Sequence, residues 1–312
     1  MKKFTLIASF FLLLISTGCS QSSASTEKST DNLEEYSITD FTGQKVTFPT
    51  VPEKLVALSS GDMEIIHSLG GKVVGRPTST DKVSSEVSEI EQIGTTHEID
   101  VEQVALLQPD VVFGHNTMNQ KDISLIEGIG SKMVLTGANS IDDIKKQIHL
   151  FGEILQKEGK AIELVTQIDA KVAKMSGEQK EKPKVLIIYG APGTYMVALP
   201  NSLSGNLLEV AGGENIAAQF TSLENYPQYA QLNAERIVIA NPSYVFLMTH
   251  GDSESVKKGF LKEMQQNAAW NSIDAVVHKR IEVLPSDLFG TNPGTRVVEA
   301  LDFLHEKLQS AE

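Results

Sequence analysis

The residues of this chain most able to do chemistry are its seven histidines, because the sequence holds only one cysteine, Cys19. A single cysteine excludes an intramolecular disulfide and every zinc or iron–sulfur site that needs several cysteines. The sequence also lacks the Gly-x-Ser-x-Gly turn of serine hydrolases, the His-Glu-x-x-His pair of zinc hydrolases and a phosphate-binding loop. We therefore expect a binding protein and not an enzyme, with any metal chemistry left to imidazole.

His250 occupies the most informative position of the seven. It closely follows the apolar run 245–248, which we interpret as a buried strand. Ligands of open α/β sheets bind beyond the carboxyl ends of the strands, so His250 is a candidate ligand-contacting residue. Four other histidines fall in predicted helices or polar turns and are expected to be structural, namely His67, His149, His278 and His305.

The composition is that of a folded protein with an ample core. The chain has 312 residues, of which 41% are hydrophobic and 21% charged, and its formal net charge is −13. An acidic chain without basic clusters does not have the electrostatics of a nucleic-acid-binding protein. It also gains no attraction to an anionic membrane, so any membrane attachment must be covalent.

The N-terminus resembles a bacterial lipoprotein signal. Lys2 and Lys3 precede an apolar run at residues 4–15, which is too short to span a bilayer. Small residues then lead to Cys19, although Ser16 stands where such signals usually carry leucine. We predict a signal peptide at 1–18, lipidation (palmitate among the acyl groups) of Cys19, and a flexible polar tether over 19–33.

Two related halves follow the tether. Residues 102–113 match residues 235–246 at a constant offset of 133, and each copy reads as a short helix, a proline and a buried strand. Glycines close similar helix ends at 70–71 and 212–213. These patterns predict an α/β fold with lobes at 34–139 and 177–312. The expected strands are at 55–58, 73–74, 111–113, 133–135, 185–189, 195–198, 245–248 and 281–284.

Residues 140–176 separate the halves and carry apolar residues at a helical spacing of three to four. Ser140 followed by Asp143 is typical of a helix start. We interpret this segment as one long helix of about 35 residues, roughly 50 Å in length. Such a helix would connect the lobes as a stiff strut.

This combination of features resembles the class III substrate-binding proteins of ABC importers. Three local motifs add to the likeness: an opening hairpin at 38–49, the pattern Glu-x6-Pro-Asp-x-Val at 102–112, and Gly-Gly-Glu-Asn at 212–215. The resemblance covers residues 34–310 and implies two Rossmann-like lobes joined by a long helix. Residues 75–79, 183–198 and 249–260 are most similar to heme-binding members from Gram-positive bacteria, which implies heme b (iron protoporphyrin IX) as cargo.

The resemblance implies that each lobe supplies one iron ligand. His250 lies in the stretch that matches the family's histidine ligand. His97 occupies the slot of the family's methionine ligand, so the chain departs from the pattern there. Imidazole is a common axial ligand of heme iron. We therefore expect bis-histidine ligation, with His115, Met63 and Met118 as alternatives for the second ligand.

Heme also requires an apolar slot and partners for its propionates. We expect Lys82 to neutralise a propionate and Tyr195 to stack on the ring. The candidate hydrogen-bond donors are Ser59, Ser60, Gly61, Thr78 and Ser79. A ferric siderophore or a corrinoid is the alternative cargo, although the four arginines are too widely spaced to favour a highly anionic siderophore.

The family docks to its permease through one exposed glutamate on each lobe. By position, the resemblance points to Glu209 in the second lobe and to Glu86 in the first, with Glu89 as an alternative. The implied partners are an ABC permease with its ATPase, and heme-donor surface proteins upstream. The resemblance thus implies a monomeric receptor on the extracytoplasmic face of the cell membrane, held there by its lipid alone.

Overall fold

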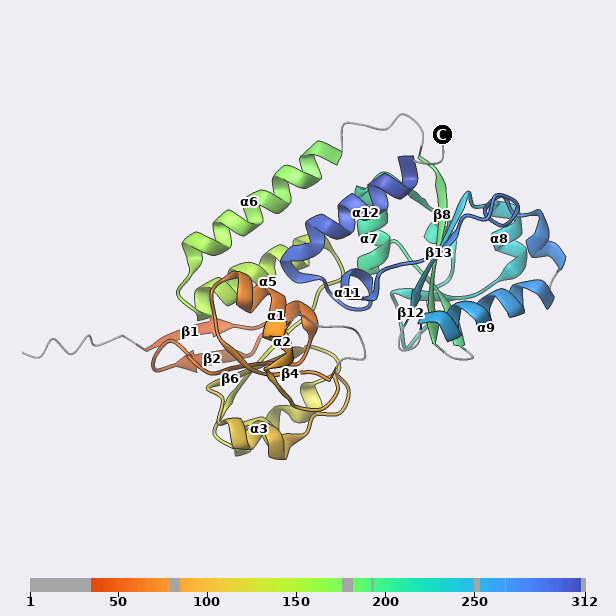
Figure 1. The fold of residues 1–312 in the computed structure, drawn as a ribbon. Coiled ribbons are helices and arrows are strands. Elements are labelled where there is room, and N and C mark those ends of the chain that lie inside the picture. Colours follow the sequence, from red (N-terminus) through yellow and green to blue (C-terminus); the bar gives the residue numbers. More distant parts are fainter. Residues whose placement is uncertain are drawn as a thin grey trace, which may run out of the picture. The chain divides into compact units, whose positions relative to one another are not determined.

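The computed structural model describes residues 35–78, 85–175, 182–191, 194–249, 253–266 and 268–309 (Figure 1). The expected signal peptide, Cys19 and the tether lie outside these ranges. Residues 34–312 group into one compact unit. None of the helices in the described ranges is long and apolar enough to cross a lipid bilayer.

A parallel five-stranded sheet forms the first lobe, in the order β5-β4-β3-β6-β7. Its strands are β3 (Leu55–Ala57), β4 (Val73–Arg76), β5 (Glu91–Gln92), β6 (Val111–His115) and β7 (Lys132–Thr136). The intervening helices are α1 (Ser60–Ser68), α2 (Ser85–Ser88), α3 (Val101–Leu107), η1 (Gln120–Asp122) and α4 (Ile123–Gly128). The expected hairpin is also present, as β1 (Tyr36–Thr39) paired with β2 (Lys45–Phe48).

A mixed sheet forms the second lobe, in the order β11-β9-β8-β12-β13, with β10 paired to β8. Its strands are β8 (Lys184–Ala191), β9 (Thr194–Ala198), β10 (Glu214–Asn215), β11 (Tyr229–Gln231), β12 (Tyr244–Thr249) and β13 (Ile281–Val283). Its helical segments are α7 (Leu203–Val210), η2 (Ile216–Gln219), α8 (Ala234–Ala240), α9 (Ser253–Gln266), η3 (Ala268–Ser272), α10 (Asp274–Val277), α11 (Ser286–Phe289), η4 (Gly294–Arg296) and α12 (Val297–Gln309). All eight strands predicted from the sequence are confirmed, within a few residues at their ends.

The prediction of one long helix between the lobes is wrong, because the segment forms two helices, α5 (Ile141–Ile154) and α6 (Glu158–Met175). Gln156 adopts a left-handed conformation with φ 51°, and the Lys157 N–H donates to the Gly152 carbonyl over 2.7 Å. This is a Schellman ending, which reverses the chain. A Cβ on Gly152 would lie 2.5 Å from the Ala161 Cβ, so the two helices pack closely there.

The internal repeat is confirmed down to its helix ends. Asp100 and Asn233 begin α3 and α8, and the side chain of each accepts a hydrogen bond from the backbone N–H three residues further on. Gln108 and Asn241, also 133 residues apart, end the two helices with φ values of 49° and 48°. The same local sequence logic therefore positions β6 and β12, the strands that carry the candidate site.

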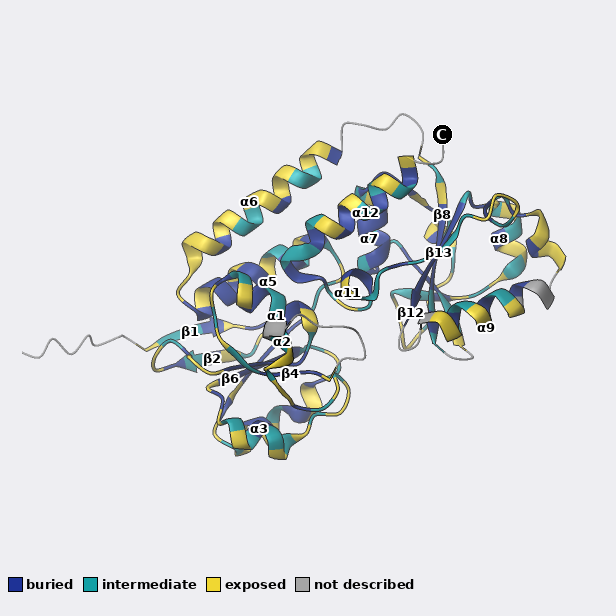
Figure 2. Cartoon of the chain, viewed as in Figure 1, coloured by how far each residue is buried: buried dark blue, intermediate teal, exposed yellow. Residues whose placement is uncertain are grey.

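One apolar core continues through both lobes. It includes Phe113 of β6, Phe151 of α5, Phe246 of β12 and Leu301 of α12. The rings of Phe113 and Phe151 are 4.2 Å apart between centroids. Figure 2 shows α5 buried along much of its length, whereas α6 is largely exposed. Two smaller cores cover the other face of each sheet. Because the main core includes residues of both sheets as well as α5 and α12, these two helices join the lobes by packing.

Candidate functional site

The carboxyl ends of the first-lobe strands bring several predicted residues to one edge of the sheet. β3 leads to Ser59, β4 leads to Thr78, and β6 ends at His115. His97 lies in the turn between β5 and α3. Parallel strands end on the same side of a sheet, which is where open α/β folds bind ligands. The structure therefore supports a common rim for these residues.

The turn at residues 94–99 holds His97 at this rim. Gly94 has φ +90°, and a Cβ there would lie 2.4 Å from the Glu98 carbonyl oxygen, so glycine is required. The Thr78 N–H donates to the Gly94 carbonyl over 2.7 Å. Lys121 Nζ donates to the His97 carbonyl over 3.0 Å. The backbone is thus braced from two sides, while the His97 side chain is exposed.

His115 lies close enough to His97 for the two imidazoles to interact. Burial of its ring, and then the nearby His97, lower the pKa of His115, which favours its neutral form. Its Nδ1 accepts a hydrogen bond from the Thr117 N–H over 3.3 Å, so the proton of the neutral ring belongs on Nε2. A protonated Nε2 has no lone pair for iron, so the geometry favours His97 over His115 as a ligand. Met63 packs against the core, which disfavours it as well.

The second-lobe ligand predicted from the sequence, His250, lies outside the described residues, as do Ser79 and Lys82. The strand before it is well placed for the prediction. β12 lies between β8 and β13, and it runs parallel to both. Its last residue, Thr249, is buried. His250 therefore comes directly after the carboxyl end of an interior parallel strand.

The Ser59–Gly61 turn combines exposed and buried positions. Ser59 Oγ accepts a hydrogen bond from the Asp62 N–H over 3.1 Å and so begins α1. Ser60 is exposed, as is Thr78 on the neighbouring loop. Gly61 is buried. The backbone of Asn292 comes so close to it that a Cβ on Gly61 would lie 2.3 Å from the Asn292 carbonyl oxygen. Ser60 and Thr78 are accessible to a ligand, whereas Gly61 serves a close backbone contact.

Tyr195 is engaged in packing between β9 and α9. Its ring lies 5.3 Å from that of Phe260, and its hydroxyl donates to the Val256 carbonyl over 3.3 Å. These contacts favour a structural role over the predicted stacking on a ligand.

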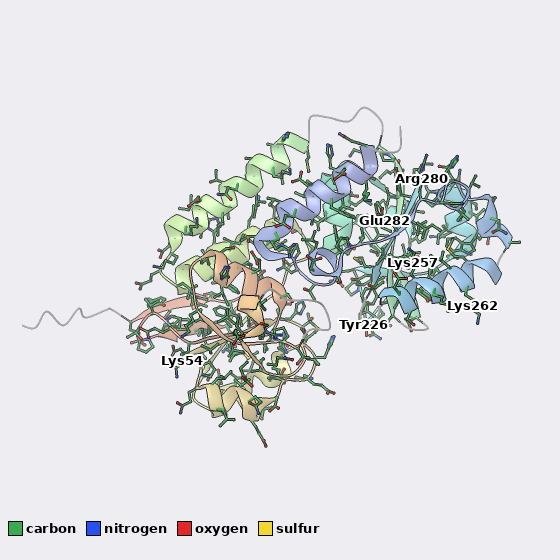
Figure 3. All side chains as sticks on the ribbon, in the orientation of Figure 1. Lys54, Tyr226, Lys257, Lys262, Arg280 and Glu282 are labelled. Carbon is green, nitrogen blue, oxygen red and sulfur yellow. The ribbon has the colours of Figure 1, made fainter. Side chains whose placement is uncertain are left out.

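The sequence reasoning missed a group of tyrosines in the second lobe. Tyr189 and Tyr229 have ring centroids 5.5 Å apart, and Tyr226, labelled in Figure 3, is 57% exposed. Burial, and then Tyr189, raise the pKa of Tyr229 to about 12, so it stays a neutral hydrogen-bonding group. Tyr226 lies three residues before Tyr229, the first residue of β11, in a polar stretch of the sequence, which is the signal that could have identified them.

Of the two candidate docking residues, the structure describes the side chain of only one. Glu209 is exposed on α7, and the Glu86 side chain lies outside the described residues. The repeat offers another pair, since Glu102 and Glu235 occupy the first turns of α3 and α8. One turn after each lies an exposed apolar side chain, Leu106 at 76% and Ile239 at 77%. Each lobe thus presents the same glutamate and apolar pair, 133 residues apart.

Known proteins share both the sequence pattern and the fold. IsdE of Staphylococcus aureus, a high-affinity heme uptake system protein, is 30% identical over 237 residues, covering 75% of this chain and 80% of that protein. The structure of IsdE complexed with heme matches with a TM-score of 0.71 and 28% identity, over 82% of this chain and 98% of that one. An ABC transporter substrate-binding protein from Listeria monocytogenes EGD-e has the same TM-score and identity, over 84% and 100% of the two chains.

The fold alone is shared more widely. SirA of Staphylococcus aureus, solved with staphyloferrin B, matches with a TM-score of 0.73 but only 22% identity, over 88% of this chain and 98% of that one. The sequence of residues 55–288 matches the model of the periplasmic binding protein family. The two α/β lobes, the repeat and these matches agree, and the chain belongs to the periplasmic binding protein family.

Proposed function

We propose that the protein is an extracytoplasmic receptor, anchored in the membrane through lipidated Cys19, that binds heme b and delivers it to an ABC importer. The observation that carries this proposal is the position of His97, exposed on a braced turn at the ligand edge of the first lobe. The 30% identity to a heme uptake protein supports the same cargo. The protein would bind its cargo without converting it.

In this proposal the iron is held by His97 from the first lobe and His250 from the second. Neutral imidazole nitrogen suits heme iron as an axial ligand. His115, neutral and with its proton on Nε2, would act as a hydrogen-bond donor beside His97. Groups of this kind orient a ligating histidine and set its basicity.

The remaining rim residues would bind the porphyrin. Ser60 and Thr78 are exposed and can donate hydrogen bonds to propionates. Ser79 and the cation of Lys82 can do the same, whereas the Ser59 hydroxyl is hydrogen-bonded to Asp62. In the second lobe we assign ring contact to Tyr226, whose large exposed side chain suits an apolar ligand face better than the packed Tyr195 does.

Cargo class is tested by quenching of the single tryptophan, Trp270. Its ring is buried and packs edge-on against Phe260, 6.0 Å away, in the second lobe. Hemin absorbs at the wavelengths at which tryptophan emits, so binding should quench the fluorescence of residues 20–312 to saturation at one hemin per chain. Saturable quenching by a ferric siderophore or a corrinoid, with none by hemin, would contradict the heme assignment.

We also propose that the permease contacts the repeated pairs Glu102 with Leu106 and Glu235 with Ile239. A partner with two-fold symmetry presents the same surface twice. The internal repeat gives each lobe one copy of a matching patch, which consists of the glutamate and the exposed apolar side chain. Docking through Glu209 and Glu86 remains a prediction, but these two residues do not occupy equivalent positions of the 133-residue repeat.

The docking proposal is tested by stimulation of the importer's ATPase in proteoliposomes. Reversal of charge in Glu102→Lys with Glu235→Lys should reduce this stimulation strongly and leave hemin binding unchanged. Glu127→Lys, at an exposed position on α4, serves as the matched control. Equal stimulation by the double variant and the control would move the docking surface elsewhere, with Glu209→Lys as the next variant.

A further inference from the structure

The chain segment that follows α11 returns to the first lobe and packs on α1. In Figure 1, the start of α12 lies close to α1 and α5. Gly294 has φ +61°, and a Cβ on it would lie 2.8 Å from the Gly61 carbonyl oxygen. Thr295 Oγ1 donates to Glu64 Oε1 over 2.9 Å. Residues more than 200 positions apart in the sequence are therefore in backbone contact.

A row of polar side chains, buried except for the half-buried Asn292, links this segment to α5 and α1. Asn292 Nδ2 donates to Gln147 Oε1 over 2.7 Å. Gln147 Nε2 in turn donates to Asp62 Oδ1 over 2.5 Å and to Thr136 Oγ1 over 2.8 Å. Asn292 Oδ1 accepts from the Gly294 N–H over 2.9 Å. Each amide thus has a fixed orientation, and the row ends at one carboxyl group.

Asp62 is 3% exposed and has no ion-pair partner among the described residues. Burial raises its pKa to about 6, while hydrogen bonds from Ser59, Thr136 and Gln147 act in the opposite direction. These three partners are uncharged.

The charged groups on the surrounding elements are occupied elsewhere. On α1 itself, Glu64 accepts hydrogen bonds from Ser68 and Thr295. On α5, Lys145 pairs with Asp142 and Asp169, and Lys146 pairs with Asp143. On η4, Arg296 pairs with Asp287 and Glu299. The remaining ionisable side chains of these elements, His67 on α1 and His149 and Glu153 on α5, are exposed. Among the described residues, no charged side chain therefore compensates an ionised Asp62.

We propose that Asp62 is a proton-dependent positioning residue, which in its neutral form holds segment 290–296 firmly against the Ser59–Gly61 turn and in its ionised form weakens that contact. An uncompensated buried carboxylate favours any opening that admits water. The junction, by which we mean the contact between segment 290–296 and the Ser59–Gly61 turn, does not depend on the cargo. Its consequence, a proton-linked ligand rim at Ser59 and Ser60, rests on the proposed function.

The test is hydrogen exchange of the cargo-free protein at pH 4 and pH 7, corrected for intrinsic exchange rates and read on peptides that cover residues 290–296. If Asp62 regains its ordinary pKa when the junction opens, the opening constant should rise about 50-fold over this interval. Asp62→Asn, which resembles the neutral acid in shape, should remove this rise. The β1–β2 hairpin provides an internal reference, since its described hydrogen bonds run within the hairpin and to Leu135 and Ile154, and not to residues 59–61 or 290–296.

Asp40→Asn is the matched control, because Asp40 is another buried acid of the first lobe, with hydrogen bonds from the backbone N–H groups of Thr42, Gln44 and Leu135. This variant should keep the pH dependence of residues 290–296. Equal pH dependence in the wild type and Asp62→Asn would overturn the proposal. If Asp62→Asn does not fold, wild-type protection that is unchanged between pH 4 and pH 7 would overturn it as well.

Discussion

Replacing Asp62 by asparagine should also remove a pH dependence from the free energy of unfolding. The pKa of this carboxyl group rises from 3.8 to about 6 on folding, because the group is fully buried. Between these values the folded protein keeps a proton that the unfolded chain has released. The unfolding free energy of the wild type therefore falls as the pH rises through this window, and the loss is complete above about pH 6.

The size of the effect follows from the two pKa values. A difference of about two units corresponds to about 3 kcal/mol. Because Asp62 is 3% exposed, solvent screening reduces this figure little. The Asp62→Asn variant does not titrate at this position, so its free energy of unfolding should gain about 2 kcal/mol relative to the wild type between pH 4 and pH 7, the part of the full shift that falls in this interval.

The assay is urea unfolding at half-unit pH steps, followed by Trp270 fluorescence and by far-ultraviolet circular dichroism. Taking the difference between the variant and the wild type at each pH removes the contributions of other titrating groups, such as His115, whose pKa is lowered on folding. A difference that stays constant from pH 4 to pH 7 would refute the account of Asp62.

Two further predictions concern the scaffold. Ser140→Ala should lower the free energy of unfolding by about 1 kcal/mol, since Ser140 Oγ accepts the Asp143 N–H over 3.1 Å at the start of α5, and urea unfolding at pH 7 measures it. Gly205→Ala should cost more than about 2 kcal/mol, because its Cβ would lie 2.1 Å from the Leu199 carbonyl oxygen. A melting temperature for Gly205→Ala equal to that of the wild type would contradict that geometry.

Local sequence patterns predicted the strands and the repeat well, because each depends on residues close together in the chain. The 133-residue offset correctly placed α3 before β6 and α8 before β12. The break between α5 and α6 was missed, since the residue that adopts the left-handed φ of 51° is a glutamine, Gln156, and not a glycine. Apolar spacing continues through that point, so periodicity alone predicts one helix.

Contacts between distant residues account for the other misses. The Asp62–Gln147–Asn292 row joins positions 85 and 145 residues apart, and no spacing rule identifies such partners. Tyr195 has the aromatic character expected of a ligand contact, but only the structure reveals its packing against Phe260. His97, in contrast, was identified by its place in a motif, and its exposure at the rim agrees with that hypothesis.

The central claim is that heme iron is held by one histidine from each lobe, and the absorption spectrum of the hemin complex tests it most directly. Residues 20–312 mixed with one equivalent of ferric hemin should give a six-coordinate low-spin spectrum. His250→Ala and His97→Ala should each convert it to a five-coordinate or weakly bound form. His149→Ala, at an exposed position on α5, should leave it unchanged. A wild-type spectrum like that of free hemin, or one unaffected by both ligand substitutions, would contradict the account.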